Sequence, residues 1–202
     1  MIKTIIFDFG DVFVNLDKQA TFRELKKSNI EELSEELQKA NREYEMGLIS
    51  TEAFIRSYIN NYSALTSEVM IAAWNAILID FPKYRFQFIK KLSEENKFQL
   101  ILLSNTNEAH IDWIKQRIPF FKEFKSCFDA FYLSHEINLR KPNSDIFQYV
   151  LEKHQLKPEE CLFIDDTPEN IETAKNLGIN VWNLEPTHED VIDLFTTNKA
   201  LF

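Results

Sequence analysis

The feature that most constrains this chain is a regular alternation between short apolar runs and longer stretches in which apolar residues recur at helical spacing. Short apolar runs bounded by polar residues are typical of strands that are buried on both faces. Alternating strands and helices favour parallel pairing through crossover helices, so we expect a layered α/β sheet. Gly178 directly follows the last helical stretch before the final run, where glycine commonly ends a helix. The five predicted strands are residues 4–9, 98–103, 129–133, 161–164 and 180–184.

The stretch between residues 17 and 79 breaks this alternation, because it contains helical periodicity alone. Gly47 and Ser50 stand where one predicted helix ends and the next begins. An insertion of this length directly after the first strand is expected to form a lid over that strand's end. We therefore divide the chain into a core of residues 1–15 and 82–202 and an all-helical cap of residues 16–81, with Pro82 forcing the return to the core.

Composition and charge exclude several classes of protein. The 202 residues carry a formal net charge of −9 at pH 7, which disfavours binding to nucleic acid phosphates. No apolar run approaches the roughly 20 residues needed to cross a bilayer, and Asp8 comes too early for a secretory signal. Two cysteines give no disulfide framework, and with four histidines they exclude an ordinary structural zinc site. We expect a cytoplasmic protein with no nucleic acid or membrane partner, and the oligomeric state stays open.

Polar residues follow three of the predicted strands at their carboxyl ends. Asp8 ends the first strand, Ser104 follows the second, and Asp165 and Asp166 follow the fourth. Ligands of open parallel sheets bind outside the carboxyl ends of the strands, so these residues are expected to converge on one crevice. Lys141 precedes a predicted helix in a loop and can join them.

Each of these residues, taken alone, also has a purely structural interpretation. Any of residues 104–106 can cap the helix that begins near Glu108. Lys141 can be a solvated loop lysine, and Asp8 can satisfy the amides of a turn. These alternatives stay open for the single residues.

The pair Asp165 and Asp166 is harder to explain in this way. Two adjacent carboxylates at a strand end, facing a third at Asp8, repel one another unless a cation or a proton lies between them. A divalent metal removes this repulsion, and a set of ligands made of oxygen alone suits Mg²⁺. The pattern therefore points to a magnesium site.

Four segments, in this order and with a helical insertion after the first, resemble the haloacid dehalogenase (HAD) superfamily of phosphohydrolases. The resemblance covers nearly the whole chain and is greatest to bacterial sugar-phosphate phosphatases of the α-D-glucose-1-phosphate phosphatase type. It implies a three-layer, Rossmann-like parallel-sheet core with an inserted all-helical cap. The segments that carry it are residues 6–12, 103–107, 132–134 together with 140–142, and 163–166.

The resemblance also implies a reaction and a cofactor. Asp8 is the expected nucleophile, which attacks phosphorus and forms an aspartyl-phosphate. Mg²⁺ is the expected cofactor, held by Asp8, Asp165 and the backbone carbonyl of Gly10. The expected substrate is a small phosphorylated metabolite, such as a hexose 1-phosphate.

Further residues receive supporting roles from the same resemblance. Ser104 and the backbone amide of Asn105 are expected to bind the phosphoryl group, and Lys141 to add a positive charge to its oxygens. Asp166 is expected to order metal-bound water, and Asn170 to support that arrangement.

Gly10 departs from the pattern of the superfamily. Most members carry a second Asp at this position, which serves as general acid and then as general base. Removal of a general acid typically slows a reaction by about 10²–10⁴-fold. An anomeric sugar oxygen is a better leaving group than an alkoxide, so we interpret Gly10 as compatible with a sugar 1-phosphate. Asp11 is adjacent, but a neighbouring side chain should point elsewhere.

Other functions also match parts of this pattern. A 2-haloacid dehalogenase would not need Asp165 with Asp166, and a mutase would need the acid that Gly10 lacks. A phosphate-binding or regulatory protein without turnover is the alternative that Gly10 favours. Residues 8–10 spell the metal-binding triplet of kinases, but no nucleotide lobe precedes them, so that match is chance.

In the cap, residues 43–46 either face the crevice or belong to the cap's surface and core.

Overall fold

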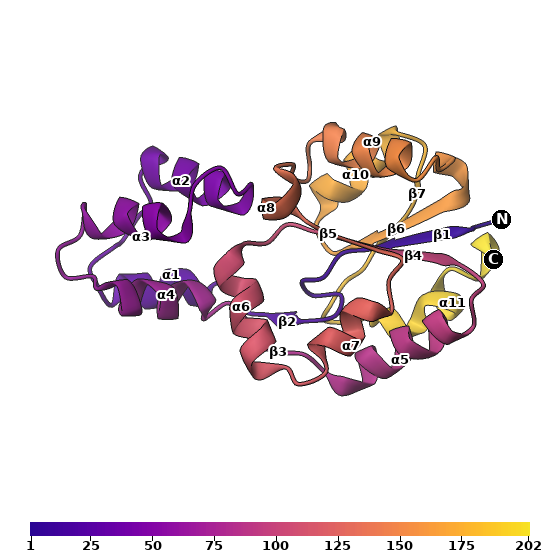
Figure 1. Ribbon diagram of the computed structural model, residues 1–202, viewed down its shortest axis with the longest axis horizontal. Helices are drawn as coiled ribbons and strands as arrows, with labels where there is room; N and C mark the ends of the chain where they lie inside the picture. The colour runs from indigo at the N-terminus through magenta and orange to yellow at the C-terminus, as the bar shows by residue number, and fades with distance from the viewer.

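The structure is a computed structural model that describes all 202 residues. Its centre is a five-stranded parallel sheet in the order β5-β4-β1-β6-β7, which confirms the predicted fold class (Figure 1). Every predicted strand is present, with ends that differ by one or two residues from those expected. The strands are β1 (Thr4–Phe7), β4 (Gln99–Ser104), β5 (Ala130–Leu133), β6 (Cys161–Asp165) and β7 (Asn180–Asn183).

Helices cover both faces of this sheet, which gives the expected three layers (Figure 1). None of them is both long and apolar enough to span a membrane. One face carries α8 (Ser134–Ile137), α9 (Ser144–Lys153) and α10 (Pro168–Asn176). The other carries α5 (Lys83–Glu94), α6 (Glu108–Arg117), α7 (Phe121–Ser126) and α11 (Leu194–Thr197). Single 3₁₀ turns form at η1 (Pro158–Glu160), η2 (Val191–Asp193) and η3 (Lys199–Leu201).

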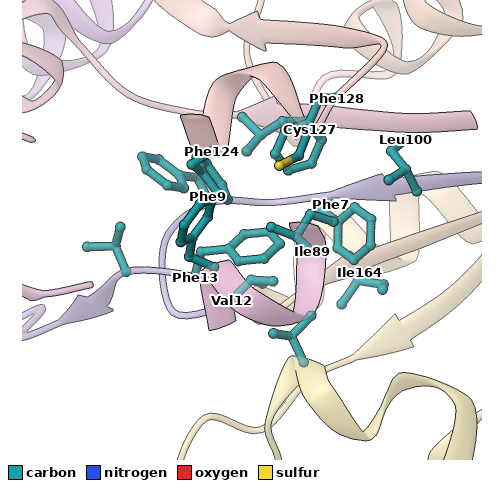
Figure 2. Packing of buried hydrophobic residues seen from close by; sticks show 14 of the residues in the cluster. Phe7, Phe9, Val12, Phe13, Ile89, Leu100, Phe124, Cys127, Phe128 and Ile164 are labelled. Atoms are coloured by element: carbon teal, nitrogen blue, oxygen red, sulfur yellow. The ribbon is translucent and has the colours of Figure 1, made fainter. Parts of the chain in front are cut away.

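An aromatic cluster fixes the turn that follows β1 (Figure 2). Phe9 stacks on Phe124 with ring centroids 5.4 Å apart, and Phe13 meets the same ring edge-on at 5.0 Å. The backbone closes the turn, because Phe13 N–H donates to Phe9 O over 2.9 Å. Each fully buried phenyl ring contributes roughly 1.5–3 kcal/mol. This packing holds residues 9–14, and therefore Gly10, in a defined place beside the end of β1.

The cap is a bundle of four helices that leaves the core through an antiparallel pair, β2 (Asn15–Leu16) and β3 (Leu78–Asp80). The expectation that residues 17–79 are helical throughout is wrong at their end, because the last helix stops at Asn75 and Leu78 pairs with Leu16. A three-residue strand that continues an apolar stripe cannot be distinguished from a helix by periodicity. The cap helices are α1 (Ala20–Lys26), α2 (Glu35–Glu45), α3 (Thr51–Ile59) and α4 (Ser67–Asn75).

The cap packs against α6 of the core. Tyr44 is buried in the cap core, and its hydroxyl accepts a hydrogen bond from Ala109 N–H over 3.0 Å. The Trp74 ring stacks on His110 with centroids 5.5 Å apart, and His110 Nε2 lies 3.2 Å from Trp74 O. These contacts join the ends of α2 and α4 in the cap to the start of α6 in the core.

A second contact joins the end of α2 to α8. Gly47 ends α2 with a φ of +65°, as the sequence predicts, and lies so close to α8 that a Cβ would sit 2.1 Å from His135 O. Ser50 caps α3, since its hydroxyl accepts from Ala53 N–H over 3.2 Å. Ser134 at the start of α8 donates from its hydroxyl to Glu45 O over 2.5 Å. The cap is therefore fastened at two places on the core.

Candidate active site

Three carboxylates meet at the carboxyl ends of the two central strands β1 and β6. Asp8 directly follows β1, Asp165 is the last residue of β6, and Asp166 comes next. One carboxylate oxygen from each of the three lies within 4.8 Å of the other two. Asp165 is fully buried, and Asp8 nearly so. Neighbouring parallel strands end at the same edge of a sheet, which explains why residues 157 positions apart come together.

Lys141 lies between two of these carboxylates. Its Nζ is 2.8 Å from Asp8 Oδ1 and 2.6 Å from Asp165 Oδ2, and its side chain is buried. Asn105 holds the lysine's loop in place, because its Oδ1 accepts from Lys141 N–H over 2.9 Å and its Nδ2 donates to Lys141 O over 2.8 Å. The Asn105 side chain thus positions Lys141. The role expected for the Asn105 backbone amide at the phosphate stays a prediction.

The electrostatics of the cluster follow from burial and charge. Burial raises the pKa of Asp8 to about 7, an effect that Lys141 opposes and Asp165 reinforces. Burial alone would lower the pKa of Lys141, but Asp165 and Asp8 raise it above its ordinary value. The lysine therefore stays charged and offsets part of the negative charge of the three carboxylates.

Asp165 is oriented by groups of its own loop and of α10. Thr167 N–H donates to Asp165 Oδ1 over 2.8 Å, and Asn170 Nδ2 lies 3.0 Å from each carboxylate oxygen. Asn170 is therefore a direct partner of Asp165, and its expected support of the metal-bound water stays a prediction. The carboxylate of Asp165 is thus fixed from three sides, counting Lys141.

Ser104 ends β4 and is buried beside the carboxylates' crevice. Helix α6 is capped by Asn107, whose Oδ1 accepts from His110 N–H over 3.1 Å, so the capping role considered for residues 104–106 is wrong. Ser104 lines a cavity of about 120 Å³. That cavity shares Gly10, Leu16 and Asn105 with the larger one described next.

Two further cavities complete the site. One of about 330 Å³ is lined by Asp8, Gly10, Lys141 and Asp166, together with residues of the surrounding loops. The other, of about 230 Å³, lies among the cap helices and reaches His110 of the core, and we call it the cap chamber. Its lining includes Lys18, Asn41, Glu45 and His110. Lys18 borders both. A cavity of about 710 Å³ between α4 and α6 contains none of the three carboxylates.

Glu45 of the cap and Arg140 of the core form an ion pair beside the site. Arg140 Nη2 lies 2.9 Å from Glu45 Oε2, which joins α2 to the loop that carries Lys141. Burial raises the pKa of Glu45, and Arg140 counteracts that effect. Of the residues 43–46 considered from sequence, Glu45 faces the chamber, whereas Tyr44 belongs to the cap core.

Lys18 is a site residue that the sequence did not reveal. It lies between β2 and α1, where its ammonium group forms an ion pair with Asp166 and lies 3.2 Å from Asp11 Oδ2. Asp11 adopts a left-handed backbone conformation with φ 55°, and its Oδ1 accepts from Leu16 N–H over 3.0 Å. A lysine at the start of a cap carries no sequence signal of a partner 148 residues away.

The cluster fits a magnesium ion. All of its donor atoms are oxygens, the type of ligand that Mg²⁺ prefers. Asp8 Oδ1 is buried and, although close to Lys141, accepts no hydrogen bond of suitable geometry. Gly10 O accepts one hydrogen bond, from Val12 N–H over 2.6 Å, and a carbonyl oxygen has two lone pairs. Asp8, Asp165, Asp166 and the Gly10 carbonyl are the groups that can hold the ion.

Comparison of sequences relates this chain to hydrolases. A profile of the haloacid dehalogenase-like hydrolases matches residues 2–178. The chain is 29% identical over 196 residues to a D-ribitol-5-phosphate phosphatase of Bacteroides thetaiotaomicron, a match that covers 92% of this chain and 93% of the other.

Solved structures support the same relationship. A HAD family enzyme of Bacteroides thetaiotaomicron is 32% identical, with a TM-score of 0.85 over 96% of this chain and 98% of that one, and it has been solved in a magnesium complex. The wild-type form of that enzyme was also solved with magnesium and inorganic phosphate. A HAD-like family hydrolase of Porphyromonas gingivalis is 31% identical, with a TM-score of 0.85 over 98% of this chain and 97% of that one.

A dehalogenase structure that is 17% identical, with a TM-score of 0.58 over 89% of this chain and 83% of that one, shares the fold alone. The profile match spans both the cap and most of the core, including all three clustered carboxylates. The sequence-based expectation of a HAD-type hydrolase is thereby confirmed. The chain belongs to the haloacid dehalogenase-like hydrolases.

Proposed function

We propose that this protein is a magnesium-dependent phosphatase that hydrolyses the phosphate monoester of a small sugar or sugar alcohol through an aspartyl-phosphate at Asp8. The observation that carries the proposal is the cluster of Asp8, Asp165 and Asp166, in which Lys141 contacts the first two, beside a cavity of about 330 Å³ that Asp8, Lys141 and Asp166 line. The relationship to hydrolases solved with magnesium and inorganic phosphate supports it.

The arrangement divides the chemistry among the chain's own groups. An oxygen of Asp8 attacks phosphorus, the ester bond breaks, and water then cleaves the aspartyl-phosphate. Lys141, held by Asn105, lies where it can pair with the phosphoryl oxygens, and Ser104 lies at the adjoining strand end. Bound Mg²⁺ would neutralise charge between the nucleophile and the phosphoryl oxygens. Asn170 and Thr167 keep Asp165 oriented for that ion.

The substrate class rests on the cap chamber and on a relative. The chamber of about 230 Å³ is smaller than the roughly 300–1,000 Å³ of most ligand pockets. Its lining combines the polar side chains of Lys18, Asn41 and Glu45 with apolar ones such as Phe22 and Trp74. Such a space suits a short leaving group that carries hydroxyls. One relative is named a D-ribitol-5-phosphate phosphatase, which favours sugar alcohol phosphates beside the hexose 1-phosphates expected from sequence.

A panel of phosphate esters tests the proposal. We expect the purified protein to release phosphate from D-ribitol 5-phosphate, α-D-glucose 1-phosphate or a related ester with Mg²⁺, and to lose this activity in EDTA. Asp8→Asn should lower the rate by about 10³-fold or more, whereas Asp112→Asn on the surface of α6 should not. A protein that binds phosphate esters without turnover, or that releases halide from 2-chloropropionate in place of phosphate, would contradict the proposal.

A further inference from the structure

Lys18 is a cap-borne cation at the junction of the two halves of the site. It follows β2, and its side chain is half-exposed, 54% of its area being accessible. It borders both the cavity that holds Asp8 and Gly10 and the cap chamber. Because the phosphoryl group belongs in the first space and the leaving group in the second, the bridging oxygen of a bound ester must lie between them. The inference below rests on the proposed function.

The reaction needs a positive or acidic group at that oxygen. Gly10 has no side chain to offer, and a Cβ added there would come within 2.7 Å of Leu16 Cδ1, so Leu16 occupies the space of an acid. D-Ribitol 5-phosphate and similar esters release an ordinary alkoxide, which is a poor leaving group without stabilisation. An anomeric leaving group would need less help, but the relative's substrate has none.

Asp11, the adjacent carboxylate, is not free to serve as that acid. Its Oδ1 accepts the Leu16 N–H and its Oδ2 pairs with Lys18, so both oxygens are engaged as acceptors. The left-handed backbone at Asp11 turns its side chain toward β2. Asp11 instead forms an ion pair with Lys18, which also pairs with Asp166.

We propose that Lys18 stabilises the negative charge that develops on the leaving oxygen, in place of the acid that Gly10 lacks. As the P–O bond breaks, its electron pair goes to the leaving oxygen, to which Lys18 Nζ–H donates a hydrogen bond. That oxygen takes its proton from water, and the resulting hydroxide is equivalent to the nucleophile that later cleaves the aspartyl-phosphate. One water molecule is consumed in each turnover, and Lys18 keeps its charge throughout. Asp11 is then a positioning residue.

Substrates with different leaving groups test this role. For Lys18→Met we expect kcat/KM for the best sugar or sugar alcohol phosphate to fall about 10²–10³-fold, the loss typical of one charge-stabilising donor. The nitrophenolate of p-nitrophenyl phosphate is a stable anion, so its release should slow by less than about tenfold. Lys18→Arg, which keeps the charge, should recover most of the loss, and Lys115→Met on the outer face of α6 should match the wild type.

A second measurement separates this role from damage to the site. Calorimetry with MgCl₂ alone should show that Lys18→Met binds the ion as tightly as the wild type or more tightly, because a competing cation has left Asp166. Asp11→Asn tolerates the same backbone conformation and should show a smaller version of the same selective loss.

The outcomes that refute the inference are distinct from those that refute the phosphatase. Equal losses on both substrates, no loss on either, or loss of Mg²⁺ binding in Lys18→Met would each overturn the role of Lys18. A wild type that cleaves p-nitrophenyl phosphate but no alkyl phosphate would overturn it as well. A wild type that cleaves no phosphate ester with Mg²⁺ would refute the proposed function itself.

Discussion

A single buried lysine sets the charge balance of this site. Lys141 contacts Asp8 and Asp165 at once, and none of the three is more than slightly exposed. A buried ion pair contributes little to stability by itself, but removing one partner leaves charges that water does not reach. Lys141 and a bound cation therefore have overlapping effects, because each offsets the negative charge of the same carboxylates.

Lys141→Met tests this relationship between lysine and metal. In EDTA at neutral pH the free energy of unfolding should fall by about 3–5 kcal/mol, since two buried carboxylates lose their partner. Mg²⁺ should then stabilise the variant more than it stabilises the wild type. Urea unfolding with and without MgCl₂ measures both effects, and Lys97→Met on the surface is the control. An equal gain from Mg²⁺ in variant and wild type would contradict the expectation.

At the scale of single residues, the sequence predicted what strand ends determine. Asp8 and Asp165 follow buried strands, so a general rule about parallel sheets places them together. Asn105 and Lys18 act through loops, and their partners depend on how those loops fold. The spacing of these residues in the sequence does not predict that the Asn105 side chain binds the Lys141 backbone, or that Lys18 pairs with Asp166.

Two glycines at helix ends differ in what surrounds them. Gly47 and Gly178 both have positive φ, which costs any other residue energy. A Cβ at Gly47 would collide with the His135 backbone at 2.1 Å, whereas at Gly178 it would meet Pro158 Cβ at an ordinary 3.6 Å. The first glycine is therefore required both by its conformation and by the contact of α2 with α8.

Gly47→Ala and Gly178→Ala form a matched pair. Gly178→Ala should destabilise the protein by about 1 kcal/mol through backbone strain alone. Gly47→Ala should cost at least about 1 kcal/mol more and should raise KM, because α2 must move away from α8. Thermal unfolding and steady-state kinetics measure the two effects. Equal destabilisation by both substitutions would show that α2 can move away from α8 at little cost in stability.

At the scale of elements, length decides what sequence reveals. The strands of the main sheet are short but each has an apolar centre, and α2 and α3 carry Gly47 and Ser50 at their boundaries. The strands β2 and β3 are not predicted from sequence, because they have only two and three residues and Leu78 continues the apolar helical pattern of α4. The periods of strand and helix cannot be told apart over so few positions.

At the scale of the whole molecule, a buried histidine lies between cap and core. His110 uses both ring nitrogens, Nε2 at 3.2 Å from Trp74 O and Nδ1 at 3.1 Å from Asn107 Nδ2. Burial lowers the pKa of His110 from 6.5 to about 4, and His135 adds to this. In the unfolded chain the His110 ring binds a proton below about pH 6.5, whereas in the folded protein it does so only near pH 4.

The stability of the wild type should consequently fall as the pH drops from about 6.5 to about 4. Over this window its free energy of unfolding should decrease by about 2–3 kcal/mol more than that of His110→Gln. Urea unfolding at a series of pH values measures the difference, and His188→Gln at an exposed position should follow the wild type. Parallel pH profiles for wild type and His110→Gln would show that the histidine is not the group responsible.

At the scale of the molecule, the sequence indicated a cap inserted after the first strand but not where that cap docks. Docking depends on Trp74 meeting His110 and on Gly47 meeting α8, contacts between surfaces that no periodicity describes. The cap chamber takes its lining from both sides of this junction, from Glu45 of α2 and Trp74 of α4 in the cap and from His110 of α6 in the core.

The narrow β2–β3 stem has a consequence for how such proteins diversify. The two chain crossings lie side by side, with Asn15 opposite Asp80 and Leu16 opposite Leu78, so both ends of the insert leave the core at one point. Recombination there can exchange a whole insert without interrupting the main sheet or the strand ends that carry Asp8 and Asp165. Transplanted inserts should reshape leaving-group preference while the reacting carboxylates stay where they are, which offers protein engineers a single splice point.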